Sequence, residues 1–187
     1  MTDAASQQAP DFLRRDAGED AHEPARAELL LETHRLTGSL EHSGPARRLV
    51  DILNAIDGPN AVVQDATAES LANPSDAPHH FKLLHVKREA ILLAVPQTDS
   101  SLPPNGGEAV EKQAAAATLI LPGLEITGHV HLPPAADPGA VRLLGRVDFL
   151  PVTEAEVTET ALGFHRWRRP LVVVNLARAL LYAPAPR

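Results

Sequence analysis

Residues 29–40 read LLLETHRLTGSL, and residues 119–130 read LILPGLEITGHV. Each stretch has an apolar triplet, a gap of four residues, and then Leu or Ile, Thr, Gly, any residue, and Leu or Val. A pattern that recurs at a distance within one chain is the sequence signature of an internal duplication. The chain is therefore predicted to contain two tandem copies of one small structural unit.

Further elements recur in the same order after this pattern. In the first copy, residues 46–56 carry apolar side chains at the spacing of one helix face, and in the second copy Asp137-Pro138 opens a shorter helical segment. Strand-like runs then follow in both copies, at 60–66 and 149–155. Each copy closes with two β-type runs joined by a short turn and followed by a proline, at 83–96 and 171–184.

These elements predict an α+β fold of two β-α-β-β-β units that pack with pseudo-twofold symmetry. The units are expected at 28–96 and 118–187, after a disordered tail over 1–27 and with a linker over 97–117 between them. The tail is polar and the linker contains Pro-Pro and Asn-Gly-Gly, so neither offers an apolar period. Because units of about 70 residues bury little surface alone, we expect the copies to cover each other or to form a homo-oligomer.

Composition narrows the possible classes of protein. The 187 residues include no cysteine, which excludes disulfides, thiolate metal sites and cysteine nucleophiles. The net charge of −7 disfavours nucleic-acid binding, which depends on neutralising phosphates with Lys and Arg. No apolar run approaches the roughly 20 residues that span a membrane, and the first residues lack the order of a secretory signal. We therefore expect a cytoplasmic protein, and its Ala, Pro and Arg usage is common in GC-rich bacterial genomes.

Residues 48–54, RLVDILN, resemble the Arg-Leu-x-Asp-x-Leu-Asn segment of a family of small bacterial domains of unknown function. Residues 149–157, FLPVTEAEV, resemble the next block of that family, and both copies approximate its closing β-hairpin and proline. The resemblance implies that the two copies are homologous, and it implies no activity. Arg48, Asp51 and Asn54 of this motif would then form either a solvated helix face or a polar contact that fixes the helix on the sheet, which is a structural role.

Two histidines are candidates for metal binding. Alternate residues of a strand share one face, so His129 and His131 could supply two ligands, with His34 or His42 as a third. The chain has no His-Glu-x-x-His motif, and ordinary strand-surface histidines explain the pattern better. We therefore predict no metal and no cofactor.

One basic and aromatic cluster stands out as a candidate ligand-binding or partner-binding surface. It consists of five consecutive residues: His165, Arg166, Trp167, Arg168 and Arg169. An indole flanked by guanidinium groups can stack on a ring or hold an anion. The alternative is a surface loop whose Trp167 covers the edge of the core.

The common catalytic signatures are missing, since the chain has no phosphate-binding Gly-x-x-x-x-Gly-Lys-Ser/Thr, no Gly-x-Gly-x-x-Gly and no Gly-x-Ser-x-Gly. We therefore interpret the chain as a non-enzymatic protein-interaction or scaffold module. Its exposed strand edges or the 165–169 segment would engage another protein or a second copy. The alternatives are a binding or sensor protein that holds a small anionic ligand in the groove between the repeats, and a metal-dependent enzyme built on His129 and His131.

Overall fold

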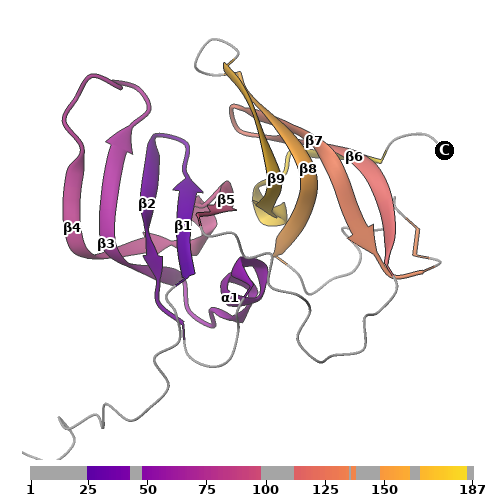
Figure 1. Ribbon diagram of the computed structural model, residues 1–187, viewed down its shortest axis with the longest axis horizontal. Coiled ribbons are helices and arrows are strands. Elements are labelled where there is room, and N and C mark those ends of the chain that lie inside the picture. Colours follow the sequence, from indigo (N-terminus) through magenta and orange to yellow (C-terminus); the bar gives the residue numbers. More distant parts are fainter. Residues whose placement is uncertain are drawn as a thin grey trace, which may run out of the picture.

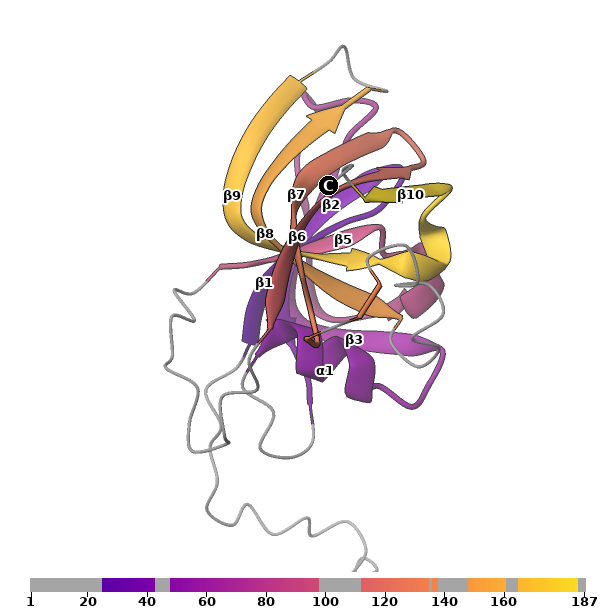
Figure 2. The same ribbon diagram turned by 90° about the vertical axis from the view of Figure 1, so that its right-hand side faces the viewer.

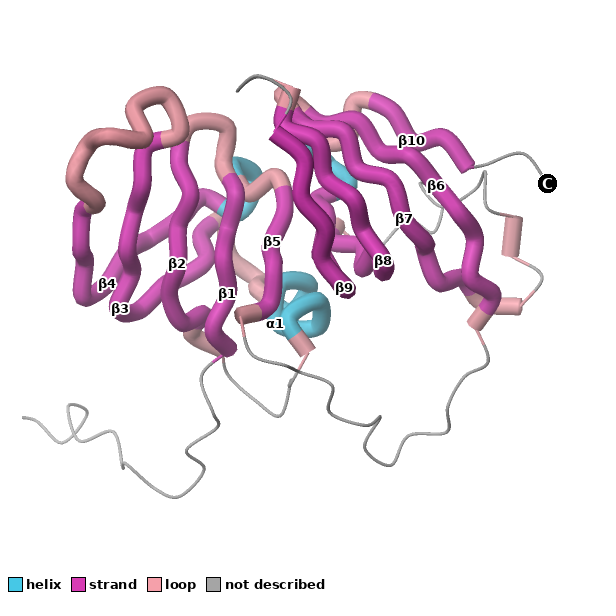
Figure 3. The backbone as a smooth tube through the Cα atoms, turned by 45° about the horizontal axis from the view of Figure 1, so that its top comes forward, coloured by secondary structure: helices cyan, strands magenta, loops and turns pink. Residues whose placement is uncertain are grey.

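The computed structural model describes residues 25–42, 48–97, 112–134, 136–137, 148–160 and 165–184. The ten strands of these described ranges belong to one antiparallel sheet, in the order β10-β6-β7-β8-β9-β5-β1-β2-β3-β4 (Figures 1 and 3). The strands are β1 Ala25–Leu30, β2 His34–Leu40, β3 Asn60–Ser70, β4 His79–Lys87, β5 Leu93–Pro96, β6 Gln113–Leu121, β7 Leu124–Leu132, β8 Phe149–Glu159, β9 His165–Asn175 and β10 Leu181–Pro184. The helices are α1 Leu49–Ala55 and the 3-10 turns η2 Arg88–Ala90 and η4 Leu176–Arg178.

The predicted α+β fold class is wrong, because the structure is almost entirely sheet. Within the described ranges, α1 is the one α-helix, and it has seven residues. The second predicted helix, after Asp137-Pro138, lies outside the described residues. The strand-like runs expected at 60–66 and 149–155 continue as long strands, in which buried residues alternate with more exposed ones, as in the eleven residues of β3.

The stretch that revealed the repeat is a hairpin in each copy, and the sequence analysis interpreted it as one strand. In the first copy β1 and β2 pair around a turn at residues 31–33. In the second copy β6 and β7 pair around Pro122-Gly123, where Gly123 has a φ of 70°. β1 begins at Ala25 and β6 at Gln113, so strand structure extends into the residues assigned to the tail and the linker.

The predicted closing hairpins are also wrong. β4 and β5 are consecutive in the chain, but they lie at opposite ends of the first five strands. β4 pairs with β3, whereas β5 pairs with β1 on one side and with β9 on the other. The turn η2 connects β4 to β5, but the two strands are not neighbours in the sheet, so they do not form a hairpin.

The two copies form two halves of the sheet with the same strand order. We call β1–β5 the N-terminal half-sheet, with the order β5-β1-β2-β3-β4, and β6–β10 the C-terminal half-sheet, with the order β10-β6-β7-β8-β9. They join head to tail through β9 and β5, and Figure 3 shows them side by side. Pseudo-twofold packing is therefore wrong, because a twofold axis would join like strands, such as β5 to β10.

Each half-sheet bends sharply at the same place. The pairing register shifts between Thr37 and Ser39 in β2 and between Thr127 and His129 in β7. The glycine at the bend is Gly38 in the first half and Gly128 in the second. A Cβ added to Gly38 would lie 2.6 Å from the Val63 side chain, and one added to Gly128 would lie 2.7 Å from the carbonyl oxygen of Thr153. The bulge therefore requires glycine, and the strong curvature of β8 and β9 is visible in Figure 2.

The apolar core consists of two clusters, and each draws residues from both half-sheets. The cluster of the C-terminal half-sheet includes Leu30, Leu92 and Leu93 from the N-terminal one. The cluster of the N-terminal half-sheet includes Phe149 and Val173 from the C-terminal one. The two halves therefore share their core across the β9–β5 junction.

Candidate functional site

The junction between β5 and β9 is the best-defined contact between the two halves. Leu93 pairs with Val174 and Ala94 with Val173, so the strand pairing itself is short. Asn175 extends it, because its backbone N–H donates to the carbonyl of Leu92 at 3.0 Å. Its side-chain amide also donates to the carbonyl of Ile91 at 2.9 Å. A short ladder and a buried amide therefore align the two strands.

Asn54 of the RLVDILN motif forms a second polar contact across this junction. Its side-chain amide donates to the carbonyl of Phe149 at 2.9 Å, and its carbonyl oxygen accepts from the Phe149 backbone N–H at 3.0 Å. Phe149 is fully buried at the start of β8. The helix of the first copy thus pairs with the backbone of the second, as a neighbouring strand would.

The other two motif residues face solvent and pair with each other. Arg48 donates from Nε and Nη2 to the carboxylate of Asp51, at 2.6 and 2.8 Å. The hydrogen bond to Asp51 raises the pKa of Arg48 above its ordinary value. Both side chains are exposed, so this pair adds little to stability.

Glu159 is the most buried carboxylate at the junction, at 3% exposure, and it receives donors from both halves. The indole N–H of Trp167 on β9 donates to its Oε1 at 2.7 Å. Arg35 on β2 reaches the same oxygen at 3.4 Å and also pairs with Glu28 at 3.0 Å. His165 lies 3.9 Å away. Trp167 is therefore a half-buried hydrogen-bond donor in a polar cluster that spans the two half-sheets.

The basic cluster at 165–169 lies on β9 and not in a loop. Arg166 and Arg168 both pair with Glu156 on the neighbouring strand β8, at 3.1 and 2.5 Å. The Arg169 guanidinium stacks 5.0 Å from the Trp167 ring centroid. Arg166 and Arg168 therefore share one carboxylate, which offsets only one of their two positive charges, and both side chains stay largely exposed.

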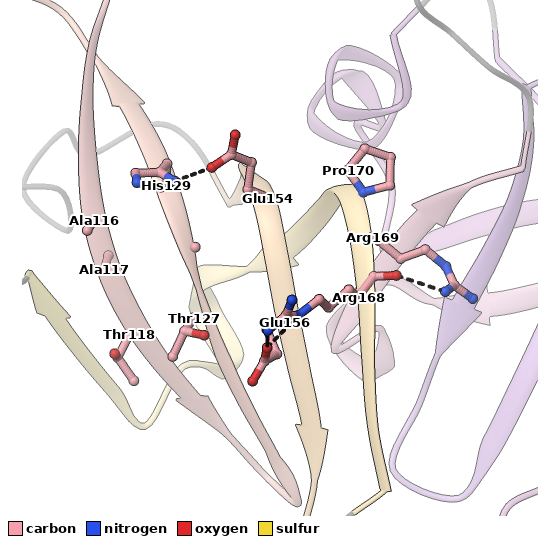
Figure 4. A pocket seen from close by; sticks show the side chains of 11 residues that line it. Ala116, Ala117, Thr118, Thr127, His129, Glu154, Glu156, Arg168, Arg169 and Pro170 are labelled. Carbon is pink, nitrogen blue, oxygen red and sulfur yellow. Dashed lines mark hydrogen bonds and ion pairs between the residues drawn. The ribbon is translucent and has the colours of Figure 1, made fainter.

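An open hollow of about 660 Å³ lies on the C-terminal half-sheet and is lined by strands β6 to β9. Figure 4 shows its lining side chains, among them Arg168 beside Glu156, and His129, which pairs with Glu154 at 3.2 Å. A smaller hollow of about 300 Å³ lies at the junction of the halves, beside the Arg88–Asp148 ion pair at 2.9 Å. Both hollows carry paired charges of opposite sign.

The two candidate metal ligands have separate partners on the sheet. His131 contacts the hydroxyl of Thr153 through Nε2 at 2.7 Å, whereas His129 pairs with Glu154. Among the residues that the structure describes, no three His, Asp or Glu side chains gather in a way that could hold a metal ion.

The two ends of the sheet have open strand edges with exposed apolar side chains beside them. In the part of the chain that is described, β4 pairs only with β3, and β10 pairs only with β6, so each leaves one edge open. Among the residues with a described environment, five large hydrophobic side chains are exposed, and all lie on or next to these end strands: Phe81, Leu83, Ile120, Leu180 and Leu181. Exposed apolar groups beside open edges are typical of protein-binding surfaces.

Three of these positions, those at the β10 end, are buried in the first copy, where the two halves meet. Leu180 and Leu181 are 70% and 44% exposed, whereas the matching residues of the first copy, Leu92 and Leu93, are 1% and 0% exposed. Ile120 is 37% exposed, and its counterpart Leu30 is 2% exposed. The sequence could not distinguish these pairs, since both copies have leucine or isoleucine there.

A scan against protein-family models matches none, and no curated protein matches the chain. The resemblance of residues 48–54 to a bacterial domain family therefore stays a prediction from the motif. No helix in the described part of the chain is long and apolar enough to cross a membrane.

Proposed function

We propose that the chain is a non-enzymatic scaffold module that binds protein through the two open ends of its sheet. The observation that carries the proposal is the position of the exposed hydrophobic side chains. They lie beside the outer edges of β4 and β10, and the counterparts of the three at the β10 end, Leu180, Leu181 and Ile120, are buried at the internal junction. An open edge offers backbone hydrogen bonds, and the apolar side chains beside it supply buried area on binding.

The composition of the edges supports this use. The β4 edge has Phe81 and Leu83 among lysines and histidines, which discourage unspecific strand pairing while leaving apolar contacts accessible. The β10 edge is four residues long and ends in Pro184, which limits the pairing length. The charged side chains of β4 and the short length of β10 therefore favour a specific partner over open-ended aggregation.

A binding site for a small anion receives less support. Its best candidates, Arg166 and Arg168, already share Glu156, and the hollow that Arg168 lines is open to solvent. An anion there would compete with the Glu156 carboxylate for both guanidinium groups and would be repelled by it, which lowers the gain in binding free energy.

The test is chemical cross-linking of the tagged full chain in extracts of its own cells, followed by mass determination of the adducts. The edge variant carries Leu83→Lys and Leu181→Lys, and the matched control carries Arg166→Ala and Arg168→Ala on β9. We expect adducts larger than the 20.0 kDa chain with the wild type and the control, and their loss in the edge variant. Adducts that survive in the edge variant would overturn the proposal, and adducts lost only in the control would move the site to β9.

A further inference from the structure

The junction inside the chain is a template for a contact between chains. At this junction β9 of the second copy pairs with β5 of the first. The strand of the first copy that corresponds to β9 is β4, and the strand of the second copy that corresponds to β5 is β10. We infer that the partner at the open edges is a second copy of this chain, whose β10 pairs with β4 in the register of β5 with β9. This inference rests on the proposed function, because it names the partner of the same edges.

The match between the two halves extends to individual backbone bonds. The backbone N–H of Leu92 donates to the carbonyl of Leu30 at 2.9 Å, and that of Leu180 donates to the carbonyl of Ile120 at 2.8 Å. Likewise, the backbone N–H of Arg88 donates to the carbonyl of Pro59 at 2.8 Å, and that of Leu176 donates to the carbonyl of Asp148 at 2.7 Å. The backbone at the end of β4 and before β10 therefore already has the conformation that the internal junction uses.

The register follows from the offset of 88 residues between matching strands, as from Pro96 to Pro184. Because Leu93 pairs with Val174 and Ala94 with Val173, Leu181 of one chain would pair with Val86 of the next, and Tyr182 with His85. The Lys87 backbone N–H would donate to the Leu180 carbonyl, as Asn175 does to Leu92.

Assembly would bury the side chains that are now exposed. Leu180, Leu181 and Ile120 would enter the core of the next chain, as Leu92, Leu93 and Leu30 enter the core of the C-terminal half-sheet. The contact uses two different surfaces, β4 and β10, so it is heterologous. Repetition of a heterologous contact gives a closed ring or an open filament rather than a simple twofold dimer.

The contact between chains lacks several polar contacts that the internal junction has, among them those of Asn175 and Asn54. Lys87 stands where Asn175 donates to Ile91, and the second copy has no RLVDILN motif to supply a counterpart of Asn54. We therefore expect assembly to be weaker than the internal junction and to depend on protein concentration. Replacing the β4 residues by their β9 counterparts, His85→Val with Lys87→Asn, should strengthen it.

The first experiment uses purified full chain and measures mass by light scattering over a range of concentrations. We expect multiples of 20.0 kDa in the wild type, and monomers for Leu83→Lys and for Leu181→Lys alone. An equimolar mixture of these two variants retains one intact β4 edge and one intact β10 edge, and it should form dimers and nothing larger. Dimers in either variant alone would indicate like-to-like pairing and would overturn the inference.

The second experiment is a gain of assembly, which does not depend on a damaging substitution. His85→Val with Lys87→Asn should shift the concentration midpoint of assembly down by roughly tenfold or more. The matched control, His79→Val, lies on the same strand outside the expected pairing and should leave the midpoint unchanged. An unchanged midpoint in the double variant would overturn the inference.

The outcomes separate the two proposals. If the purified chain stays monomeric at hundreds of micromolar while the edge variant still loses its adducts in extracts, self-assembly fails and the scaffold function stands with a different protein partner. If adducts in extracts do not depend on the edges, both fail.

Discussion

Replacing Asn54 with alanine should destabilise the whole chain, because this one side chain satisfies both backbone groups of Phe149. Each lost hydrogen bond is worth about 1 kcal/mol, and leaving a buried donor or acceptor unpaired costs about 1–3 kcal/mol. The two bonds are partly buried, so we expect water to relieve some of the penalty. The expected loss in the free energy of unfolding is about 2–4 kcal/mol.

The matched control is Asp51→Ala, one helical turn earlier on α1. It removes the exposed ion pair with Arg48, which is worth at most about 1 kcal/mol. Urea unfolding at one low protein concentration, followed by circular dichroism, measures both variants. For a slope of about 2 kcal/mol per molar urea, the midpoint of Asn54→Ala should fall by roughly 1–2 M. If the two variants differ by less than about 0.5 kcal/mol, Asn54 does not hold the halves together.

Three further predictions concern other parts of the sheet. Trp167→Phe removes the N–H donor of buried Glu159 and should cost about 1–2 kcal/mol in thermal unfolding; an unchanged midpoint would show that Glu159 does not need it. Gly128→Ala should cost about 1–3 kcal/mol because its Cβ would lie 2.7 Å from a backbone oxygen, whereas Gly58→Ala, which meets open space, should be neutral; equal melting temperatures would contradict this. Burial, and then the charge of a nearby aspartate, raise the pKa of Tyr182, so its contribution to stability is present below about pH 10 and is lost as the pH rises above it. Tyr182→Phe should flatten the dependence of urea stability on pH in that range, and an identical slope in both proteins would refute it.

The repeat could be predicted from sequence because it depends on local residues. Thr37 and Thr127 lie next to the same bulge in the two copies. The pairing register shifts after each of them, so the repeat in the sequence is also a repeat in the strand pairing. The turn inside the first hairpin was missed because residues 31–33 contain neither Gly nor Pro. The second copy has Pro122-Gly123 at the matching place, and that pair was the available signal.

The long-range contacts could not be predicted in the same way. Asn54 bonds to a residue 95 positions away, and nothing near either residue in the sequence specifies the other. Residues 165–169 resembled a loop because their arginines project from a strand toward Glu156 and solvent, which removes the apolar alternation of an ordinary strand. The exposure of Leu180 and Leu181 depends on which strand ends the sheet, a property of topology and not of local pattern.

The two half-sheets have the same backbone but different surfaces, and this has a consequence for any closed ring. Each chain contributes two half-sheets, so the number of half-sheets around the ring is always even. The arginine-bearing β9 of one half alternates with the histidine- and lysine-bearing β4 of the other. A ring of these chains would therefore display two alternating chemistries around its circumference, and it would break apart at every second seam, releasing whole chains.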